Sequence, residues 1–206
     1  MNRKKIGIIG GTFDPVHNGH LKAAEIVFEQ MDLDELIFIP AYVAPHKVNI
    51  ETAPSQDRLN MVKLAISNNK NFKCSDIEIK RKGISYTYDT LKSLKETSFA
   101  EDELFFVIGM DSFLELNTWK NLLGILSLAT LIVATRPGFE EAVEEASKSI
   151  SENKNNRIKY LNAPGLGISS TEIRDKIQNN DSLEEALPNS VIKYIKEHGL
   201  YKKKQF

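Results

Sequence analysis

Two histidines stand three residues apart shortly after a glycine pair: His17 and His20 follow Gly10 and Gly11. Side chains at this spacing share one face of a helix, so both imidazoles would point the same way if a helix begins here. The first turn of a helix also carries unpaired backbone N–H groups and the positive end of the helix dipole. Such donors bind phosphate oxygens. A single histidine is more often an ordinary helix-start or core residue, but the pair behind two glycines favours a phosphate site.

A second group of donors stands near the other end of the chain, in the segment ISSTEIR, residues 168–174. Ser169 and Glu172 have the spacing of a capping box, which predicts that a helix begins here. Capping leaves Ser170 and Arg174 unexplained. Consecutive hydroxyls at a helix start, with a guanidinium one turn further on, make a second anion site suited to bidentate contact with phosphate.

Polar and aromatic side chains also follow several predicted strands. Lys47 lies in a long loop, 41–54, that comes directly after an apolar strand. Asp111 follows the clearest strand, where a carboxylate serves as a helix cap, a partner for ribose hydroxyls or a metal ligand. Asp89 is a predicted helix cap in the segment 85–90. Trp119, the only tryptophan, has a π-face suited to stacking on a ring, although most tryptophans simply fill grooves or the core.

The hydrophobic pattern predicts an α/β fold that places these groups at strand ends. Short apolar runs rich in β-branched residues are typical of strands buried on both faces of a parallel sheet. Apolar residues at helical spacing, such as Leu21, Ala24 and Phe28, predict helices between them. The predicted strands are residues 6–9, 36–39, 72–79, 104–108, 131–135 and 158–161. Helices are predicted from the first histidine, after an N-cap at Ser55, after 85–90, over 143–150 and after Ser169, with two short ones in 182–198.

Length and composition limit the class of protein. A chain of 206 residues suits one domain, and we expect a single domain over 1–206 with a C-terminal helical extension over 182–206. The formal net charge of −1 gives no broad cationic field, so we expect no nucleic-acid partner. Cys74, the only cysteine, favours a reducing cytoplasm. No apolar run is long enough for an export signal or a membrane span, so we expect a cytoplasmic protein without a membrane partner.

Residues 10–21, GGTFDPVHNGHL, resemble the signature of the nucleotidyltransferase superfamily with the HxGH motif, and most closely that of bacterial nicotinate mononucleotide adenylyltransferases. Residues 168–174 match the second signature of this superfamily, and residues 45–47, 85–90 and 109–113 resemble motifs of the family in the expected order. The resemblance implies a Rossmann-like, doubly wound parallel sheet of the nucleotidyltransferase type. It also implies transfer of the adenylyl group of ATP to nicotinate mononucleotide in NAD biosynthesis, giving nicotinate adenine dinucleotide and pyrophosphate, with Mg²⁺ as cofactor.

Roles for single residues follow from the motifs and the resemblance together. The expected catalytic residues are His17, His20, Lys47 and Arg174. The residues expected to bind ATP are Gly10, Gly11, Thr12, Phe13, His20, Gly109, Asp111, Ile168, Ser169, Ser170 and Arg174. Those expected to bind nicotinate mononucleotide are Thr87, Trp119, Lys47 and Arg136. No residue is assigned as a metal ligand.

The chemistry of this transfer explains why few catalytic groups are needed. A phosphate monoester is already largely ionised near neutral pH, so its attack on the α-phosphorus of ATP needs no general base. The sequence shows no convincing catalytic triad or carboxylate pair, in agreement with this expectation. The remaining tasks are to hold the attacking oxygen in line and to stabilise charge on the transferring group and the departing pyrophosphate.

Other functions stay open. The acceptor could be nicotinamide mononucleotide or another phosphate monoester such as phosphopantetheine, or CTP could react with an alcohol phosphate; the motifs at 45–47, 85–90 and 109–113 argue against the latter two. A non-catalytic nucleotide sensor is disfavoured because both anion-binding motifs are intact. An oxidoreductase is excluded mainly by the missing G-x-G-x-x-G fingerprint, and a P-loop by the missing Gly-Lys-Ser/Thr. The oligomeric state is open, a homo-oligomer included.

Overall fold

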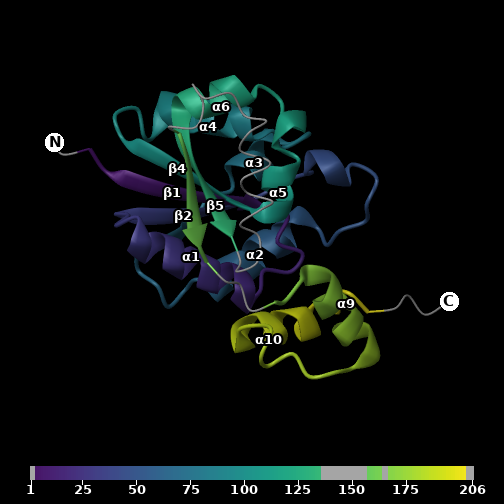
Figure 1. Ribbon diagram of the computed structural model, residues 1–206. Coiled ribbons are helices and arrows are strands. Elements are labelled where there is room, and N and C mark those ends of the chain that lie inside the picture. The colour runs from purple at the N-terminus through teal and green to yellow at the C-terminus, as the bar shows by residue number, and fades with distance from the viewer. Residues whose placement is uncertain (1–2, 136–156, 164–166, 203–206) are drawn as a thin grey trace.

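A six-stranded, all-parallel β-sheet forms the centre of the computed structural model, which describes residues 3–135, 157–163 and 167–202 (Figure 1). Its strand order is β3-β2-β1-β4-β5-β6, the standard order of a doubly wound sheet. The strands are β1 (Lys5–Gly11), β2 (Glu35–Pro40), β3 (Phe72–Cys74), β4 (Glu103–Gly109), β5 (Ala129–Thr135) and β6 (Ile158–Asn162). The predicted fold class, an α/β fold with a Rossmann-like parallel sheet, is therefore confirmed.

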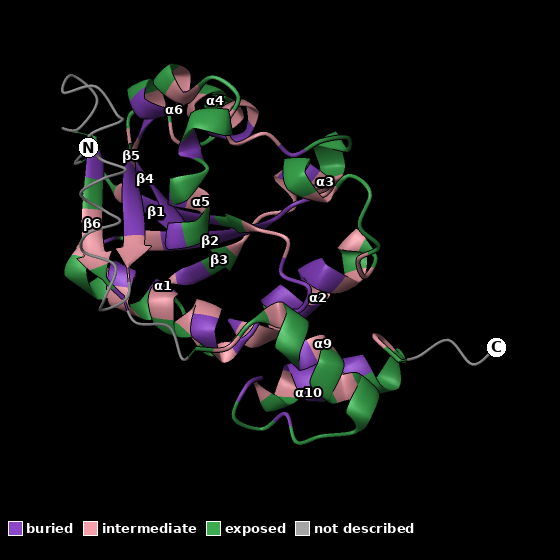
Figure 2. Ribbon diagram, turned by 45° about the vertical axis from the view of Figure 1, so that its right-hand side comes forward, coloured by how far each residue is buried: buried purple, intermediate pink, exposed green. Residues whose placement is uncertain are grey.

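Helices cover both faces of the sheet, as the nearly continuous burial of the strands requires (Figure 2). One hydrophobic cluster joins the sheet to α1 (Asn18–Gln30), α2 (Ser55–Ala65), α9 (Ser170–Asn179) and α10 (Asn189–Glu197). A second cluster joins the opposite face to α4 (Thr87–Thr97), α5 (Met110–Leu114) and α6 (Leu122–Leu128). The remaining described helices are α3 (Ile77–Arg81) and the 3₁₀ turns η1 (Pro45–Lys47) and η2 (Leu116–Thr118).

Strand β1 shows why its centre carries apolar side chains on both faces. Ile6 and Ile8 point into the cluster on the α4 side, whereas Ile9 points into the cluster on the α1 side. Alternate residues of a strand face opposite sides, so a strand between two helical layers needs apolar residues at both sets of positions. The prediction that this strand is buried on both faces is confirmed.

The carboxyl ends of the central strands meet at one edge of the sheet. Gly11 at the end of β1 pairs with Pro40 at the end of β2, and on the other side Ile9 pairs with Val107 near the end of β4. The chain runs outward from β1 through β2 to β3, and outward from β4 through β5 to β6. The order therefore reverses between β1 and β4, and open α/β sheets bind ligands in the crevice at such a reversal.

Several local predictions were wrong. The predicted strand 72–79 ends at Cys74, because Ser75 Oγ accepts the N–H of Ile77 at 3.4 Å and a helix, α3, follows. Ser55 is the first residue of α2 and not its N-cap, which is Pro54. Asp89 does not cap α4; its carboxylate pairs with Lys120 at 3.2 Å.

The C-terminal region also differs from its prediction. Residues 182–198 were predicted to form two short helices, whereas the described structure has one, α10, preceded by a turn at 184–186 and capped by Pro188. Proline lacks the N–H that a continuous helix would need there. Helix α10 packs against α2, as Tyr194 on α10 donates to Asp57 on α2 at 2.8 Å. The predicted helix 143–150 lies outside the described residues.

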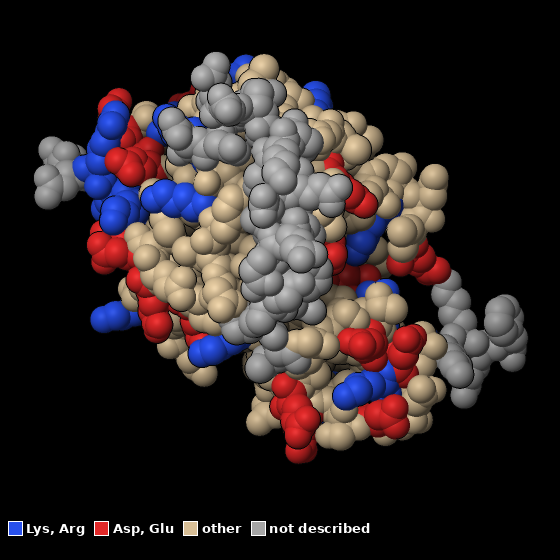
Figure 3. Space-filling view, viewed as in Figure 1, with Lys and Arg blue, Asp and Glu red and all other residues tan. Residues whose placement is uncertain are grey.

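Acidic and basic side chains lie interspersed on the face shown in Figure 3. The formal net charge of the whole chain is −1. No helix in the described ranges is long and apolar enough to cross a membrane.

Candidate active site

His17 and His20 cap the first turn of α1 reciprocally. Nδ1 of His17 accepts the backbone N–H of His20 at 3.3 Å, and Nδ1 of His20 accepts the backbone N–H of His17 at 3.2 Å. The two rings stack with centroids 3.6 Å apart. A backbone N–H can only donate, so both Nδ1 atoms must be unprotonated, and a neutral ring then carries its proton on Nε2. Helix capping therefore fixes both imidazoles in the tautomer that offers an Nε2–H donor.

The surroundings of His20 keep its ring neutral. Its pKa lies well below the ordinary value of 6.5, first because burial disfavours the charged form and then because a positive charge on His17 or Lys47 would repel it. The ring also packs edge-on to Phe13, with centroids 5.1 Å apart. At neutral pH, His20 is thus a hydrogen-bond donor without a full charge.

Two glycines make room for this arrangement. A Cβ on Gly19 would lie 3.0 Å from Nδ1 of His17, so the missing side chain lets the His17 ring fold back over the helix start. A Cβ on Gly11 would lie 3.1 Å from the ring of Phe13. Phe13 has φ of 51° and is 3% exposed, so the turn after β1 is tightly packed. Gly11, which the sequence analysis places at ATP, therefore has a packing reason as well, as does Gly19.

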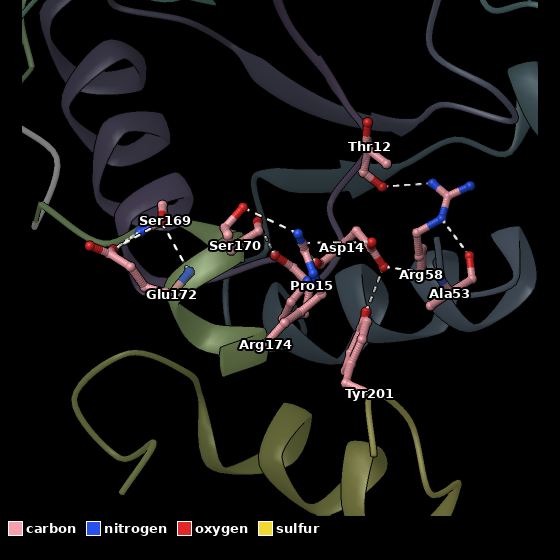
Figure 4. Close-up of polar contacts among 11 residues, drawn as sticks. Thr12, Asp14, Pro15, Ala53, Arg58, Ser169, Ser170, Glu172, Arg174 and Tyr201 are labelled. Atoms are coloured by element: carbon pink, nitrogen blue, oxygen red, sulfur yellow. Dashed lines mark hydrogen bonds and ion pairs between the residues drawn. The ribbon is translucent and has the colours of Figure 1, made fainter. Parts of the chain in front are cut away.

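Helix α9 docks its N-terminus onto the same turn (Figure 4). Ser170 Oγ donates to the carbonyl of Pro15 at 3.0 Å, and Arg174 Nη1 donates to the carbonyl of Asp14 at 2.8 Å. Ser169 and Glu172 form the predicted capping box, with Glu172 N donating to Ser169 Oγ at 3.2 Å. The N-termini of α1 and α9, which are far apart in sequence, therefore lie side by side, and their hydrogen-bond donors are close together.

A buried carboxylate stands at the centre of this contact. Asp14 is 3% exposed, and its Oδ1 accepts the N–H of Ala53 at 3.0 Å and the hydroxyl of Tyr201 at 2.8 Å. Its Oδ2 lies 3.8 Å from Arg174 Nη1. Sequence reasoning assigned no role to Asp14, although it lies inside the glycine–histidine motif.

Arg58 is a second residue that no sequence pattern singled out. It is 1% exposed, and its guanidinium donates to three backbone carbonyls. These acceptors are Ala53 at 2.9 Å, Thr12 at 2.6 Å and Tyr42 at 3.0 Å. One side chain of α2 thereby ties the turn after β1 to both ends of the 41–54 loop. No local pattern marks such a residue, because its partners are distant backbone atoms.

Lys47 extends the positive charge around Asp14. Burial lowers the pKa of Lys47, Asp14 acts in the opposite direction, and Arg174 and Arg58 lower it further. Three cationic side chains from separate elements thus lie within electrostatic range of one carboxylate. The excess positive charge suits a ligand with several negative charges.

The remaining predicted residues lie toward the α4 and α6 side of the sheet. Thr87 is the first residue of α4, and Asp111 lies exposed in the first turn of α5, two residues after Gly109. Trp119 is half-buried, with its ring edge-on to Phe106 at 6.2 Å. The structure thus places Trp119 against the core cluster on this face. Arg136 lies outside the described residues.

A buried polar network anchors the segment that carries Thr87. Ser85 Oγ accepts the N–H of Tyr42 at 2.9 Å, and Thr90 Oγ1 donates to Glu78 at 2.6 Å. Burial raises the pKa of Glu78, while hydrogen bonds from Thr90 and Ser85 and the charge of Arg81 act against that rise. Ser85 therefore joins the 85–90 segment to the loop bearing Lys47, and Thr90 joins it to α3.

Two hollows accompany these elements. One of about 420 Å³ adjoins the N-terminus of α9 and is lined in part by Gly167, Ile168 and Glu172. A larger one of about 560 Å³ lies between α2 and α10 and contains none of the predicted site residues, so size alone does not identify the functional site. Within the described part of the chain, no group of three or more His, Cys, Asp or Glu side chains is arranged to hold a metal ion.

Residues 8–176 match the family model described as cytidylyltransferase-like. The chain is 45% identical over 201 residues to a protein of Desulfitobacterium hafniense (strain Y51) named "probable nicotinate-nucleotide adenylyltransferase", covering 97% of this chain and 96% of the relative. A protein of Clostridium acetobutylicum with the same name is 42% identical over 199 residues, covering 96% and 99% of the two chains.

Solved structures show the same fold. The Plasmodium falciparum nicotinic acid mononucleotide adenylyltransferase complexed with NaAD superimposes with a TM-score of 0.76 at 22% identity, covering 97% of this chain and 98% of that one. The same parasite enzyme complexed with APC gives a TM-score of 0.74 at 21% identity. With two adjoining helix N-termini and matching relatives over nearly its whole length, the chain belongs to the cytidylyltransferase-like family and, within it, to the nicotinate-nucleotide adenylyltransferases.

Proposed function

We propose that this protein transfers the adenylyl group of ATP to nicotinate mononucleotide, forming nicotinate adenine dinucleotide and pyrophosphate in NAD biosynthesis. The observation that carries the proposal is the contact between the two helix N-termini, where Arg174 on α9 donates to the backbone of Asp14 at 2.8 Å. This contact joins two groups of phosphate-binding donors into one site for a triphosphate. The names of the relatives agree with the proposed reaction.

In this reaction a phosphate oxygen of the mononucleotide attacks the α-phosphorus of ATP. A new P–O bond forms, the bond between the α-phosphorus and its bridge oxygen breaks, and pyrophosphate leaves with the electron pair. The attacking phosphate is already ionised, so the protein needs no base. Its task is to align the groups and to stabilise the charge that moves onto pyrophosphate.

The four catalytic residues divide this task by their chemistry. His17 and His20 offer Nε2–H donors to the α- and β-phosphates, because capping holds their Nδ1 atoms as acceptors. Lys47 and Arg174 add positive charge toward the polyphosphate. All four belong to preorganised elements, so little reorganisation is needed as charge develops.

The two substrates occupy neighbouring parts of the crevice in this proposal. ATP lies over the glycine–histidine turn and α9, against Gly10, Gly11, Thr12, Phe13, His20, Gly109, Asp111, Ile168, Ser169, Ser170 and Arg174. Nicotinate mononucleotide lies toward Thr87 and Trp119, with its charges met by Lys47 and Arg136. Stacking on an aromatic ring suits a pyridine base.

Mg²⁺ enters in this proposal as part of the substrate Mg·ATP. Lys47, Arg58 and Arg174 give the site excess positive charge. This charge disfavours a bare cation but suits Mg·ATP, whose net charge is negative. The oxygens of Asp14 already face Ala53, Tyr201 and Arg174. The ion would neutralise charge on the triphosphate and the departing pyrophosphate.

One assay tests the function. Pyrophosphate release from Mg·ATP is measured with nicotinate mononucleotide, nicotinamide mononucleotide or phosphopantetheine offered in parallel. We expect the highest kcat/KM with nicotinate mononucleotide. A higher value with another acceptor would reassign the substrate, and no release with any of them would favour the nucleotide sensor.

The cellular location, the partners, the domain organisation and the oligomeric state remain proposals. The cytoplasmic location rests on the single cysteine, and the lack of a nucleic-acid partner rests on the net charge. The single domain with a C-terminal extension and a homo-oligomeric state are likewise predictions. Light scattering at several protein concentrations would test the oligomeric state.

A further inference from the structure

The C-terminal end of the described chain reaches the candidate active site. The hydroxyl of Tyr201 donates to Oδ1 of Asp14 at 2.8 Å, and Figure 4 shows this side chain rising from the C-terminal segment toward the turn after β1. The two residues are 187 positions apart in sequence. A residue from the end of the chain therefore completes the surroundings of a carboxylate beside the catalytic histidines.

Asp14 links three segments that carry phosphate-binding groups. Its Oδ1 also accepts the N–H of Ala53, at the end of the loop that carries Lys47. Its Oδ2 and its carbonyl both face the guanidinium of Arg174. The orientation of this one carboxylate therefore affects the position of two cationic side chains at once.

The hydroxyl of Tyr201 is a dependable donor to that carboxylate. Burial raises its pKa, and the neighbouring negative charge of Asp14 raises it further, whereas Arg58 and Arg174 lower it. The group therefore keeps its proton over the whole range in which the enzyme would work. A hydrogen bond from a neutral donor to a buried carboxylate is among the stronger ones in proteins.

We propose that Tyr201 is a positioning residue for adenylyl transfer: its hydroxyl holds the Asp14 carboxylate, which in turn holds Arg174 and the Lys47 loop against the triphosphate. This inference rests on the proposed function. It gives the C-terminal segment a role in the phosphate site in addition to its packing.

The chain supplies a matched control in Tyr194. Its hydroxyl also donates to a carboxylate, Asp57, at 2.8 Å, and it accepts from Asn60 at 2.9 Å. Both tyrosines belong to the C-terminal region, but the partners of Tyr194 lie on α2 and contact none of the proposed catalytic residues. Replacing each tyrosine by Phe removes one hydroxyl bonded to a carboxylate, inside the site in one variant and outside it in the other.

The experiment compares Tyr201→Phe with Tyr194→Phe. For Tyr201→Phe we expect kcat to fall about tenfold and the Kd of Mg·ATP, measured by calorimetry, to rise about tenfold, because the phosphate-binding groups lose their alignment. The KM of nicotinate mononucleotide should stay within about twofold. Tyr194→Phe should keep kcat and Kd, while both variants should have similar melting temperatures. Equal kcat and Kd in the two variants would overturn the inference.

A double-mutant cycle tests whether Tyr201 acts through Asp14. If it does, Tyr201→Phe added to Asp14→Asn should lower kcat no further than Asp14→Asn alone. If the two substitutions lowered kcat additively, Tyr201 would not act through Asp14. The wild-type assay separates the two levels of proposal: a wild type that releases no pyrophosphate with any acceptor refutes the function, whereas an active wild type with an unaffected Tyr201→Phe refutes only this inference.

Discussion

The phosphate side of the candidate site, formed by Asp14, His17, His20, Ser170 and Arg174, is held far more firmly than the acceptor side, formed by Thr87 and Trp119. On the phosphate side each named side chain bonds to the backbone or to a side chain of another segment. Among the described residues, no hydrogen bond to protein holds the side chains of the acceptor side.

This difference matches the two tasks of the proposed reaction. Charge moves onto the departing pyrophosphate, and donors that are already in place stabilise it without reorganising. The acceptor only has to enter, be aligned and leave as part of the product. Substitutions on the phosphate side should therefore lower kcat, whereas those on the acceptor side should mainly raise KM for nicotinate mononucleotide.

The largest effect is expected for His20→Asn. Asn places an acceptor oxygen near the position of Nδ1, so the cap to the N–H of His17 can persist while the Nε2–H donor is lost. We expect kcat to fall by about 10² to 10³. Steady-state kinetics measure the loss, and His198→Asn, at the C-cap of α10, is the control. A kcat near that of the wild type would show that the phosphate side does not depend on this donor.

Arg58→Met tests whether buried cross-links are what make the phosphate side firm. The change leaves three backbone carbonyls without the guanidinium. We expect the free energy of unfolding to fall by about 3 kcal/mol, measured by urea denaturation. Lys63→Met, at an exposed position of the same helix, should cost no more than about 1 kcal/mol. Equal losses in the two variants would show that the guanidinium of Arg58 does not stabilise the phosphate side.

Trp119→Ala probes the acceptor side. If the indole stacks on the pyridine ring, the KM for nicotinate mononucleotide should rise about tenfold while the KM for Mg·ATP is unchanged. Trp119→Phe should recover part of the loss, since it keeps an aromatic face. An unchanged KM in Trp119→Ala would leave the residue with only its packing against Phe106.

The smallest effect concerns pH. The pKa of folded His20 lies below its ordinary value, so the unfolded chain binds the proton more readily. The stability that depends on neutral His20 is present above about pH 6.5 and is lost as the pH falls toward the folded pKa. Urea denaturation at about pH 7.5 and about pH 5.5 should show a larger drop for the wild type than for His20→Asn. Parallel curves would contradict a buried neutral imidazole.

The sequence by itself determined the features that depend on neighbouring residues. The apolar runs predicted five of the six strands closely, and the serine–glutamate spacing predicted the capping box of α9. The histidine pair predicted the start of α1. Such patterns involve residues a few positions apart, whose geometry follows from the helix or strand itself. The strand predicted over 72–79 was wrong because the chain turns after Cys74, where Ser75 Oγ accepts the N–H of Ile77, and α3 follows.

Only the tertiary structure decided which distant groups meet in the site. Arg58 bonds to Thr12 across 46 positions, Arg174 to Asp14 across 160 and Tyr201 to Asp14 across 187. None of these contacts has a local pattern, because a buried charge is satisfied by whichever backbone or side chain the packed sheet brings beside it. Local spacing thus predicted two phosphate-binding helix starts, and the parallel sheet, with strand order reversing between β1 and β4, brought them to one edge.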